Sequence, residues 1–466
     1  MTGPHDPAGS IPLHLLHEED VDRWRDAQDE RTRNWVLAHA FKAERHKVLV
    51  VPDALGRPAG VAVGVGRRGA GDRPGCWLAA AISDRLPEGR YHLAEPLREA
   101  DALQFAFGWA YGQYRYERYR RAAVPRAAHL QLPSGVDAAE LERLCAATTL
   151  ARDLINTPAN DLSPQALAQV ALEVATRYGA SCREIVGDNL LIERFPAVHA
   201  VGRAAAVAPR VLDISWGDPA HPRLALVGKG VCFDSGGLDI KPGASMINMK
   251  KDMGGAAVAL SLAQLVMDAA LPVRLRLVLP IAENAISSNA YRPGDVLQTR
   301  KGLSVEVGNT DAEGRLILCD ALALADEDAP DLLIDTATLT GAARVALGPE
   351  LPALFANDDV LAERLVAIAH AQADPLWRLP LWSGYEDELS SKIADLNNVA
   401  SSSFSGAIFG ALFLRRFVSA ARAWMHLDLY AWNGKERPGR PAGAEPQTVR
   451  ALYAFLKEHY KDRTAR

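Results

Sequence analysis

Strand-like and helix-like segments alternate along the second half of this chain, and this alternation constrains the fold more than any other feature. Apolar runs typical of buried strands lie at Leu224–Val227, Val273–Ile281, Leu303–Val307 and Leu332–Asp335. Segments rich in Ala and Leu, typical of helices, lie at Gly254–Ala269 and Leu316–Ala325. This order predicts an α/β domain with a mixed, mainly parallel central sheet and helices on both faces. Sheets of this kind bind ligands at the carboxyl ends of their strands.

The first 135 residues lack this long alternation and predict a separate, smaller unit. Short apolar runs at Lys47–Pro52 and Gly60–Gly66 are typical of strands, and Ala100–Arg121 predicts a helix. A second helix is expected over Ala138–Ile155, ending before Asn156-Thr157-Pro158. Two domains are the natural expectation for 466 residues. We therefore predict an N-terminal α/β domain over 1–135, a linker helix over 136–155 and a catalytic domain over 156–466.

Composition narrows the functional class without identifying it. The net charge of -5 gives no general reason to expect nucleic acid or an anionic membrane as a partner. Five scattered cysteines, without a Cys-x-x-Cys pair, indicate reduced thiols in a cytoplasmic protein. No apolar stretch approaches 18 uninterrupted residues, and the N-terminus lacks the pattern of a secretion signal, so we expect no membrane span.

Two polar clusters follow predicted strands and bring together unusual charges. One runs from Gly228 to Gly255 and the other from Asn309 to Arg315. Their charged residues include four acids, Asp234, Asp252, Asp311 and Glu313, and three cations, Lys229, Lys241 and Arg315. Burying four acids without partners would be very costly. An ion-pair network at a loop crossing and a two-metal hydrolytic site are both compatible with this set. The glycine pairs 236–237 and 254–255 favour the metal site, because they let backbone approach a ligand closely.

Rival motifs receive less support. Asp234-Ser235-Gly236-Gly237 has the letters of a serine-protease nucleophile, but the α/β alternation contradicts a double β-barrel. No His-Glu-x-x-His occurs, so zincin chemistry is not expected, and His426 is interpreted as a core histidine. Tyr and Arg alternate over 111–121, which is interpreted as one face of an amphipathic helix rather than a nucleic-acid surface.

The clusters together resemble one known family. Asn309-Thr310-Asp311-Ala312-Glu313-Gly314-Arg315-Leu316 matches the signature of the leucyl aminopeptidases, the M17 cytosol aminopeptidases. The first cluster matches that family in residue type and spacing, and Asn156–Asn160 resembles its junction before the catalytic domain. This resemblance extends from about residue 145 to 432. It implies a small N-terminal domain similar to macrodomains.

The resemblance also implies a role for each charged residue. Asp234 and Glu313 are expected to bridge two divalent ions, Mn or Zn. Lys229, Asp252 and Asp311 are expected to complete the metal ligands. Lys241 would stabilise the oxyanion, and Arg315 would hold a bicarbonate that acts as general base. Met249, Thr338, Leu339 and Gly341 are the implied substrate-binding residues.

Substrate and assembly also follow from the resemblance. It implies a leucyl-type aminopeptidase that acts on peptides with a free N-terminus and assembles as a homo-hexamer. The resemblance implies a pocket that prefers apolar N-terminal residues. Tyr430 stands where the family more often has a small residue, so the shape of this pocket is expected to differ from the family's. The alternative is a non-catalytic member kept as an oligomeric scaffold or nucleic-acid-binding protein. All seven charged side chains to which the resemblance gives a role are present, which favours the enzyme over the scaffold.

Overall fold

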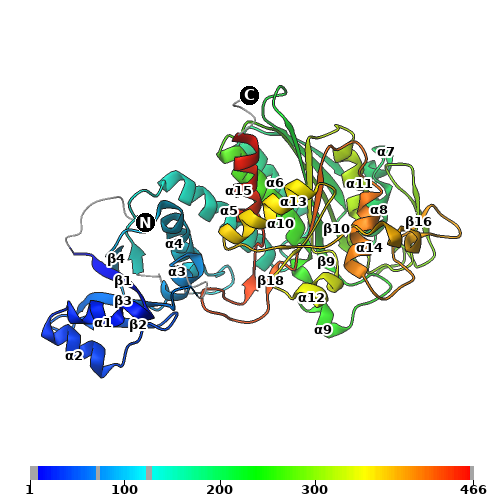
Figure 1. Ribbon diagram of the computed structural model, residues 1–466. Coiled ribbons are helices and arrows are strands. Elements are labelled where there is room, and N and C mark those ends of the chain that lie inside the picture. Colours follow the sequence, from blue (N-terminus) through cyan, green and yellow to red (C-terminus); the bar gives the residue numbers. More distant parts are fainter. Residues whose placement is uncertain (1–8, 70–73, 122–127, 462–466) are drawn as a thin grey trace. The chain divides into compact units, whose positions relative to one another are not determined.

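The computed structural model describes residues 9–69, 74–121 and 128–461, which form two compact units (Figure 1). The first unit is Met1–Ala146 together with Gly434–Ala442, and the second is Ala147–Asn433 with Gly443–Arg466. Residues 434–442 were predicted as part of the catalytic domain, but by their contacts they belong to the first unit. The fold class, a two-domain α/β protein with a mixed, mainly parallel sheet, is confirmed.

The first unit contains a five-stranded sheet in the order β2-β3-β1-β4-β5, in which only β2 is antiparallel to its neighbour. Its strands are β1 (Ile11–His17), β2 (Val48–Pro52), β3 (Pro58–Gly66), β4 (Gly89–Leu93) and β5 (Ala128–Leu130). Its helices are η1 (Glu18–Asp20), α1 (Val21–Asp26), α2 (Glu30–Ala38), α3 (Cys76–Ile82) and α4 (Glu99–Gln113). Helix α5 (Ala138–Asn156) follows. The strands expected at Lys47–Pro52 and Gly60–Gly66 are confirmed as β2 and β3.

Helix α4 is shorter than predicted, because the chain becomes extended at Tyr114 (φ -60°, ψ 134°). The guanidinium of Arg115 donates to the carbonyl oxygens of Gly112 at 2.9 Å and Tyr114 at 2.7 Å. These bonds satisfy carbonyls that a continuing helix would have used. The prediction that the Tyr and Arg residues up to Arg121 form one helical face is therefore wrong beyond Gln113.

The second unit contains a nine-stranded sheet in the order β15-β14-β17-β13-β8-β10-β7-β6, with β9 also paired to β10. Its central strands β17, β13, β8 and β10 are parallel. The strands are β6 (Ser181–Val186), β7 (Arg210–Trp216), β8 (Arg223–Gly228), β9 (Gly230–Asp234), β10 (Arg274–Asn284), β13 (Leu332–Ala337), β14 (Ala353–Ala356), β15 (Trp377–Arg378) and β17 (Trp424–Asp428). Small sheets are formed by β11 (Val296–Gln298), β12 (Ser304–Glu306) and β16 (Leu396–Asn397), and by β18 (Trp432–Asn433) and β19 (Gly443–Ala444).

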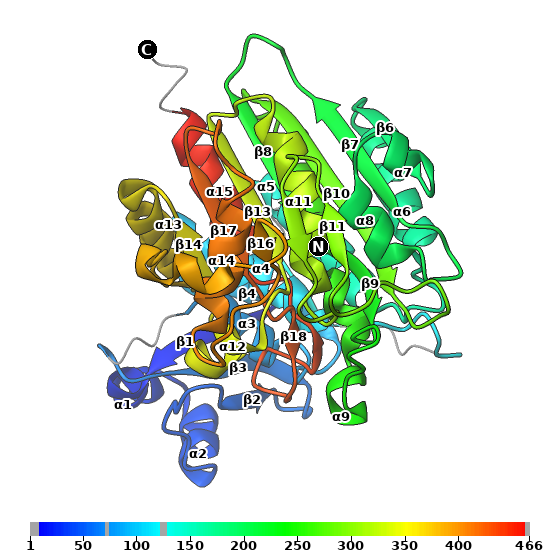
Figure 2. The same cartoon turned by 90° about the vertical axis from the view of Figure 1, so that its right-hand side faces the viewer.

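Helices cover both faces of this sheet (Figures 1 and 2). One face carries α6 (Pro164–Arg177), α10 (Gly254–Asp268), α13 (Asp359–Ala371) and α15 (Val449–Lys461). The other face carries α8 (Pro196–Gly202), α11 (Glu313–Asp326) and α14 (Gly406–Arg415). The remaining helices are α7 (Asn189–Ile192), α9 (Gly243–Met246), η2 (Met249–Met253), α12 (Gly341–Leu347) and η3 (Ser383–Leu389). The alternation read from the sequence thus gave the correct layers.

Helix α10 is mostly apolar and is buried from Gly254 to Met267, and its first turn approaches the sheet very closely. A Cβ atom on Gly255 would lie 2.2 Å from the carbonyl oxygen of Thr336 in β13. Only glycine allows this approach. The same contact brings η2, and with it Asp252, to the carboxyl ends of the strands. No helix among the described residues is long and apolar enough to span a membrane.

Candidate metal centre

The charged residues of both sequence clusters meet at the carboxyl ends of neighbouring strands. Lys229 follows β8, Asp234 ends β9 and Thr338 follows β13. Asp252 lies in η2, and Glu313 begins α11. Helix α11 was predicted to begin at Leu316. It begins three residues earlier, so Glu313 lies in its first turn, where the positive end of the helix dipole favours a carboxylate.

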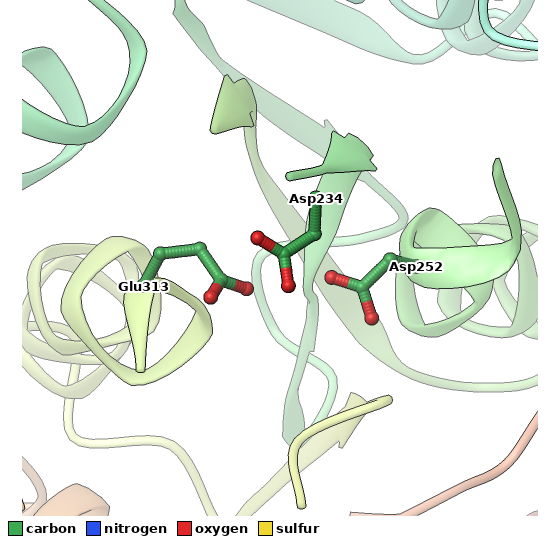
Figure 3. A group of neighbouring side chains, drawn as sticks. All are labelled: Asp234, Asp252 and Glu313. Carbon is green, nitrogen blue, oxygen red and sulfur yellow. The ribbon is translucent and has the colours of Figure 1, made fainter. Parts of the chain in front are cut away.

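Three buried carboxylates point toward one another from three different elements (Figure 3). Each of Asp234, Asp252 and Glu313 offers one oxygen, and these oxygens lie within 4.8 Å of one another. All three residues are at most 4% exposed. Oxygen donors at this spacing suit hard divalent cations.

Lys229 lies between two of these carboxylates. Its Nζ is 2.7 Å from Asp252 Oδ2 and 2.9 Å from Glu313 Oε1, and it donates to the Thr338 carbonyl at 2.8 Å. Burial would lower the pKa of Lys229, but Asp252 and Glu313 raise it above its usual value. A Cβ on Gly314 would lie 2.5 Å from Lys229 Cε, so a glycine after Glu313 is required for this lysine to reach across.

Lys241 connects the two sequence clusters. Its Nζ lies 2.7 Å from Asp234 Oδ2 and also pairs with Asp311 Oδ1. Asp234 Oδ1 accepts hydrogen bonds from the backbone N–H of Gly236 at 2.9 Å and the amide of Asn284 at 2.8 Å. Burial would lower the pKa of Lys241, but Asp234 raises it, as does Asp311.

The two lysines do not fully offset the four acids. Burial raises the pKa of Glu313 to about 8, and repulsion from Asp234 adds to this despite Lys229. Burial also raises the pKa of Asp311 to about 6, again with repulsion from Asp234. Burial would raise the pKa of Asp252, but Lys229 lowers it. The cluster therefore has an excess of negative charge that further cations would relieve.

Arg315 lies in the first turn of α11 and is 7% exposed. Its Nη1 donates to the Asn398 carbonyl at 2.7 Å. Its Nε is buried without a hydrogen-bond partner among the described residues. Burial lowers the pKa of Arg315 to about 10, against the opposing effect of Glu313. An unsatisfied buried guanidinium N–H is a donor available for an anion.

Of the four substrate-binding candidates, Thr338 has the most direct contact with the cluster. Its hydroxyl lies 2.8 Å from both the backbone oxygen and Oδ1 of Asp252. Met249 begins η2, three residues before Asp252, and Gly341 begins α12. The backbone N–H of Leu339 donates to Asp428 Oδ1 at 2.9 Å.

Two residues that hold the site together were not predicted. The side-chain amide of Asn284, fully buried at the end of β10, joins Asp234 to the Thr310 carbonyl at 3.0 Å. The side chain of Asn398 accepts from the backbone N–H of Gly308 at 2.7 Å and donates to the Asn309 carbonyl at 2.8 Å. Neither asparagine lies in a motif, and no local pattern indicates that they bridge loops 26 and 89 residues away.

Lys251 is a further buried cation beside this site, and no role was predicted for it. It is 4% exposed, and its Nζ lies over the ring of Tyr430 at 4.7 Å from the centroid. Burial lowers the pKa of Lys251 to about 8, opposed by Asp252.

Four acids, two lysines and an arginine gather near the strand ends of this α/β sheet. This arrangement is typical of a metal-dependent hydrolase rather than of a serine-nucleophile enzyme. The comparisons give the family. The model of the cytosol aminopeptidase catalytic domain matches residues 149–453, and that of the M17 N-terminal domain matches residues 11–133. The chain belongs to the cytosol aminopeptidase family, and it is a metalloexopeptidase.

Individual relatives match over nearly the whole chain. A probable cytosol aminopeptidase of Syntrophotalea carbinolica is 37% identical over 453 residues, covering 91% of this chain and 90% of its own. The crystal structure of a cytosol aminopeptidase from Coxiella burnetii has a TM-score of 0.93 at 44% identity and covers 98% of both chains. The bottromycin maturation enzyme BotP, solved in complex with Mn, has a TM-score of 0.88 at 34% identity, covering 97% of this chain and all of its own.

Proposed function

We propose that this enzyme removes the N-terminal residue of peptides with two divalent ions, Mn or Zn, as cofactors. Its metal ligands would be Lys229, Asp234, Asp252, Asp311 and Glu313. The observation that carries the proposal is the convergence of three buried carboxylates within 4.8 Å, with more negative charge than the lysines offset. The Mn complex of BotP supports manganese as one usable metal.

The residues present fit such ions. Carboxylate oxygens are the donors that Mn and Mg prefer, and they also serve Zn. When bound, two divalent ions would supply Lewis acidity and a nucleophile at neutral pH. Lys229 contacts Asp252 and Glu313 at hydrogen-bond distance, so its amine is already placed among the other donors. To act as a ligand it must lose a proton.

Lys241 is proposed to stabilise the oxyanion that forms when the peptide carbonyl is attacked. It is an ammonium fixed by Asp234 and Asp311 at the edge of the carboxylate cluster. A cation held in advance near the developing charge costs no reorganisation during the reaction, so this effect is large.

Arg315 is proposed to hold a bicarbonate ion, which would supply a general base. The buried Nε of Arg315 without a partner among the described residues fits an anion at that position. The second guanidinium edge is fixed by Asn398, so the donor is oriented in advance.

The selectivity for N-termini would come from the free amine of the substrate. We propose that the amine binds near Asp252 and Lys229, with Thr338, Leu339, Gly341 and Met249 around the first residue. An internal peptide bond offers no such amine. The hydrogen bonds of Thr338 to Asp252 support this placement.

Assembly and location are also part of the proposal. We propose a homo-hexamer acting in the cytoplasm on peptides with a free N-terminus. The names of the relatives, probable cytosol aminopeptidases, support that location.

The test is an assay of metal-free protein to which Mn or Zn is restored. We expect chelation to abolish hydrolysis of leucine p-nitroanilide and of dipeptides, and restoration to recover it together with two metal equivalents by elemental analysis. An N-acetylated dipeptide is the matched control and should not be cleaved. Remetallated protein that cleaves none of the free substrates would overturn the proposal and leave the scaffold alternative.

A further inference from the structure

Two cations contact one aromatic ring beside the metal centre. The ring is that of Tyr430, whose centroid lies 4.7 Å from Lys251 Nζ and 4.8 Å from Arg344 Cζ. Lys251 directly precedes Asp252 in η2, Arg344 lies in α12, and Tyr430 lies just after β17. Three separate elements therefore bring the Lys251–Tyr430–Arg344 group together.

Neither cation has an anionic partner among the described residues. Within the parts of the chain that the structure describes, no ion pair or hydrogen bond joins the Lys251 ammonium or the Arg344 guanidinium to another group. The two nearby acids are already engaged. Asp252 pairs with Lys229, and Asp428 accepts from the backbone N–H groups of Leu339 and Thr340 and from the Thr340 hydroxyl.

A buried ammonium without a carboxylate is costly to maintain. Lys251 is 4% exposed, and the burial of an unpaired charge is strongly unfavourable. Contact with an aromatic face offsets only a small part of this cost. The Arg344 guanidinium stacked on the same ring still has its N–H edges available for a planar carboxylate. An anionic ligand would supply the missing partner for both cations.

A peptide offers two possible anions, the side-chain carboxylate of its first residue and its C-terminal carboxylate. The position of the Lys251–Tyr430–Arg344 group relative to the substrate determines which of them it can bind. This step rests on the proposed function, in which the substrate amine binds beside Asp252. The side chain of the first residue begins one bond from the carbon that bears this amine, so it lies near the residues flanking Asp252. The carboxylate at the far end of a dipeptide lies across the scissile bond, on the side of Lys241.

We propose that the Lys251–Tyr430–Arg344 group selects peptides whose N-terminal residue has a carboxylate side chain, glutamate or aspartate, over those that begin with leucine. The preference departs from the apolar one implied by the family resemblance. The reason is Tyr430, which holds two cations on its ring.

The test compares kcat/KM for the p-nitroanilides of glutamate, glutamine and leucine with the Mn-restored enzyme. We expect glutamate to exceed both others by about tenfold or more, because its carboxylate forms a charge-assisted hydrogen bond that the uncharged side chains cannot form. Glutamine is nearly isosteric with glutamate and isolates the charge. Free glutamate should likewise inhibit leucine hydrolysis more strongly than free glutamine. Equal or lower values for glutamate would overturn the proposal.

Variants of the exposed Arg344 test the group without disturbing the core. Arg344→Met should lower the ratio of glutamate to leucine kcat/KM by about tenfold, mainly through KM, and Arg344→Lys should restore part of it. Arg344→Glu should shift the preference toward N-terminal lysine. Arg416→Met, which removes another exposed arginine at the end of α14, is the matched control and should leave the ratio unchanged. A ratio unaffected by Arg344→Met would contradict the assignment.

Three further outcomes separate this proposal from others. If Arg344→Met slows the hydrolysis of Leu-Gly but not that of Leu-Gly-amide, the two cations recognise the C-terminal carboxylate of the dipeptide. The proposal that they recognise the N-terminal side chain then fails. If leucine p-nitroanilide is cleaved in a Mn-dependent way without any glutamate preference, only the selectivity fails. If no substrate is cleaved and no metal binds, the proposed function itself fails.

Discussion

At the scale of single residues, the site is controlled by how charges are balanced. Lys229 contacts two carboxylates and Lys241 contacts two, yet the pKa of Glu313 is still raised to about 8 by burial and by Asp234. Ligands that repel one another in this way form a site that gains stability when a divalent cation binds. Each acid is therefore expected to matter more for metal content than for folding.

Replacing Glu313 tests this balance directly. Glu313→Ala removes one of the three converging carboxylates and should lower the bound metal below two equivalents per chain, as measured by elemental analysis after dialysis. The urea midpoint of unfolding of the metal-free variant should be no lower than that of metal-free wild-type protein, because an acid that repels its neighbours has been removed.

Glu327→Ala is the control for this change. Glu327 caps the other end of the same helix, is exposed and pairs with Arg300 at the surface. Its loss should leave the metal content unchanged. Full metal occupancy in the Glu313 variant would show that this carboxylate is no ligand.

At the scale of elements, the close approach of α10 to the sheet positions Asp252. Gly255→Ala would place a Cβ 2.2 Å from the Thr336 oxygen, so the helix must move away from β13. We expect a loss of about 3 kcal/mol in the free energy of unfolding, measured with urea, because overpacking strains the core. Gly243→Ala, at the start of α9, meets no atom within 4 Å and should be neutral or slightly stabilising. Equal effects of the two changes would show that the contact is unimportant.

The pairing of β13 with β17 contains a buried charged pair. His426 Nδ1 lies 2.5 Å from Asp335 Oδ1, and Trp424 Nε1 donates to Asp335 Oδ2 at 2.8 Å. Both paired residues are completely buried, which confirms His426 as a core histidine. Burial would lower the pKa of His426, but Asp335 raises it above its usual value of 6.5.

This raised pKa predicts how stability changes with pH. The folded chain holds the His426 proton more tightly than the unfolded chain. The stabilisation is therefore fully present below about pH 6.5 and is lost as the pH rises through the folded pKa. Relative to His426→Gln, metal-free wild-type protein should lose up to about 1.4 kcal/mol per pH unit above pH 6.5 in urea unfolding. His370→Gln, at the exposed end of α13, should retain the wild-type slope. Parallel slopes for wild type and His426→Gln would refute the linkage.

At the scale of the whole molecule, the open question is assembly. The proposed homo-hexamer has six times the 50.3 kDa mass of one chain. Light scattering coupled to size exclusion should therefore return about 300 kDa, independent of loading concentration over the micromolar range, as large obligate interfaces require. A monomer mass would contradict the hexamer while leaving the metal centre of each chain intact.

Much of the fold followed from local patterns. The alternation from Leu224 to Asp335 was sufficient to predict the layered sheet, because buried parallel strands and the helices between them have distinct lengths and compositions. Two predicted helix boundaries were wrong, because hydrophobic periodicity does not record how a helix end is satisfied. The end of α4 depends on a side chain, Arg115, that satisfies the last carbonyls, and the start of α11 at Glu313 depends on the loop that precedes it.

The sequence by itself determined the chemical inventory of this protein: two clusters that include the four acids and three cations of the proposed site, and the family that carries them. Only the tertiary structure decided how these groups are paired, because ion pairs such as Lys229 with Glu313 join residues 84 positions apart. It also revealed Asn284 and Asn398 as bridges between loops, and it placed Lys251 and Arg344 on the ring of Tyr430. The physical reason is that charge balance in a buried site depends on distance in space, which a sequence records only where a motif is contiguous.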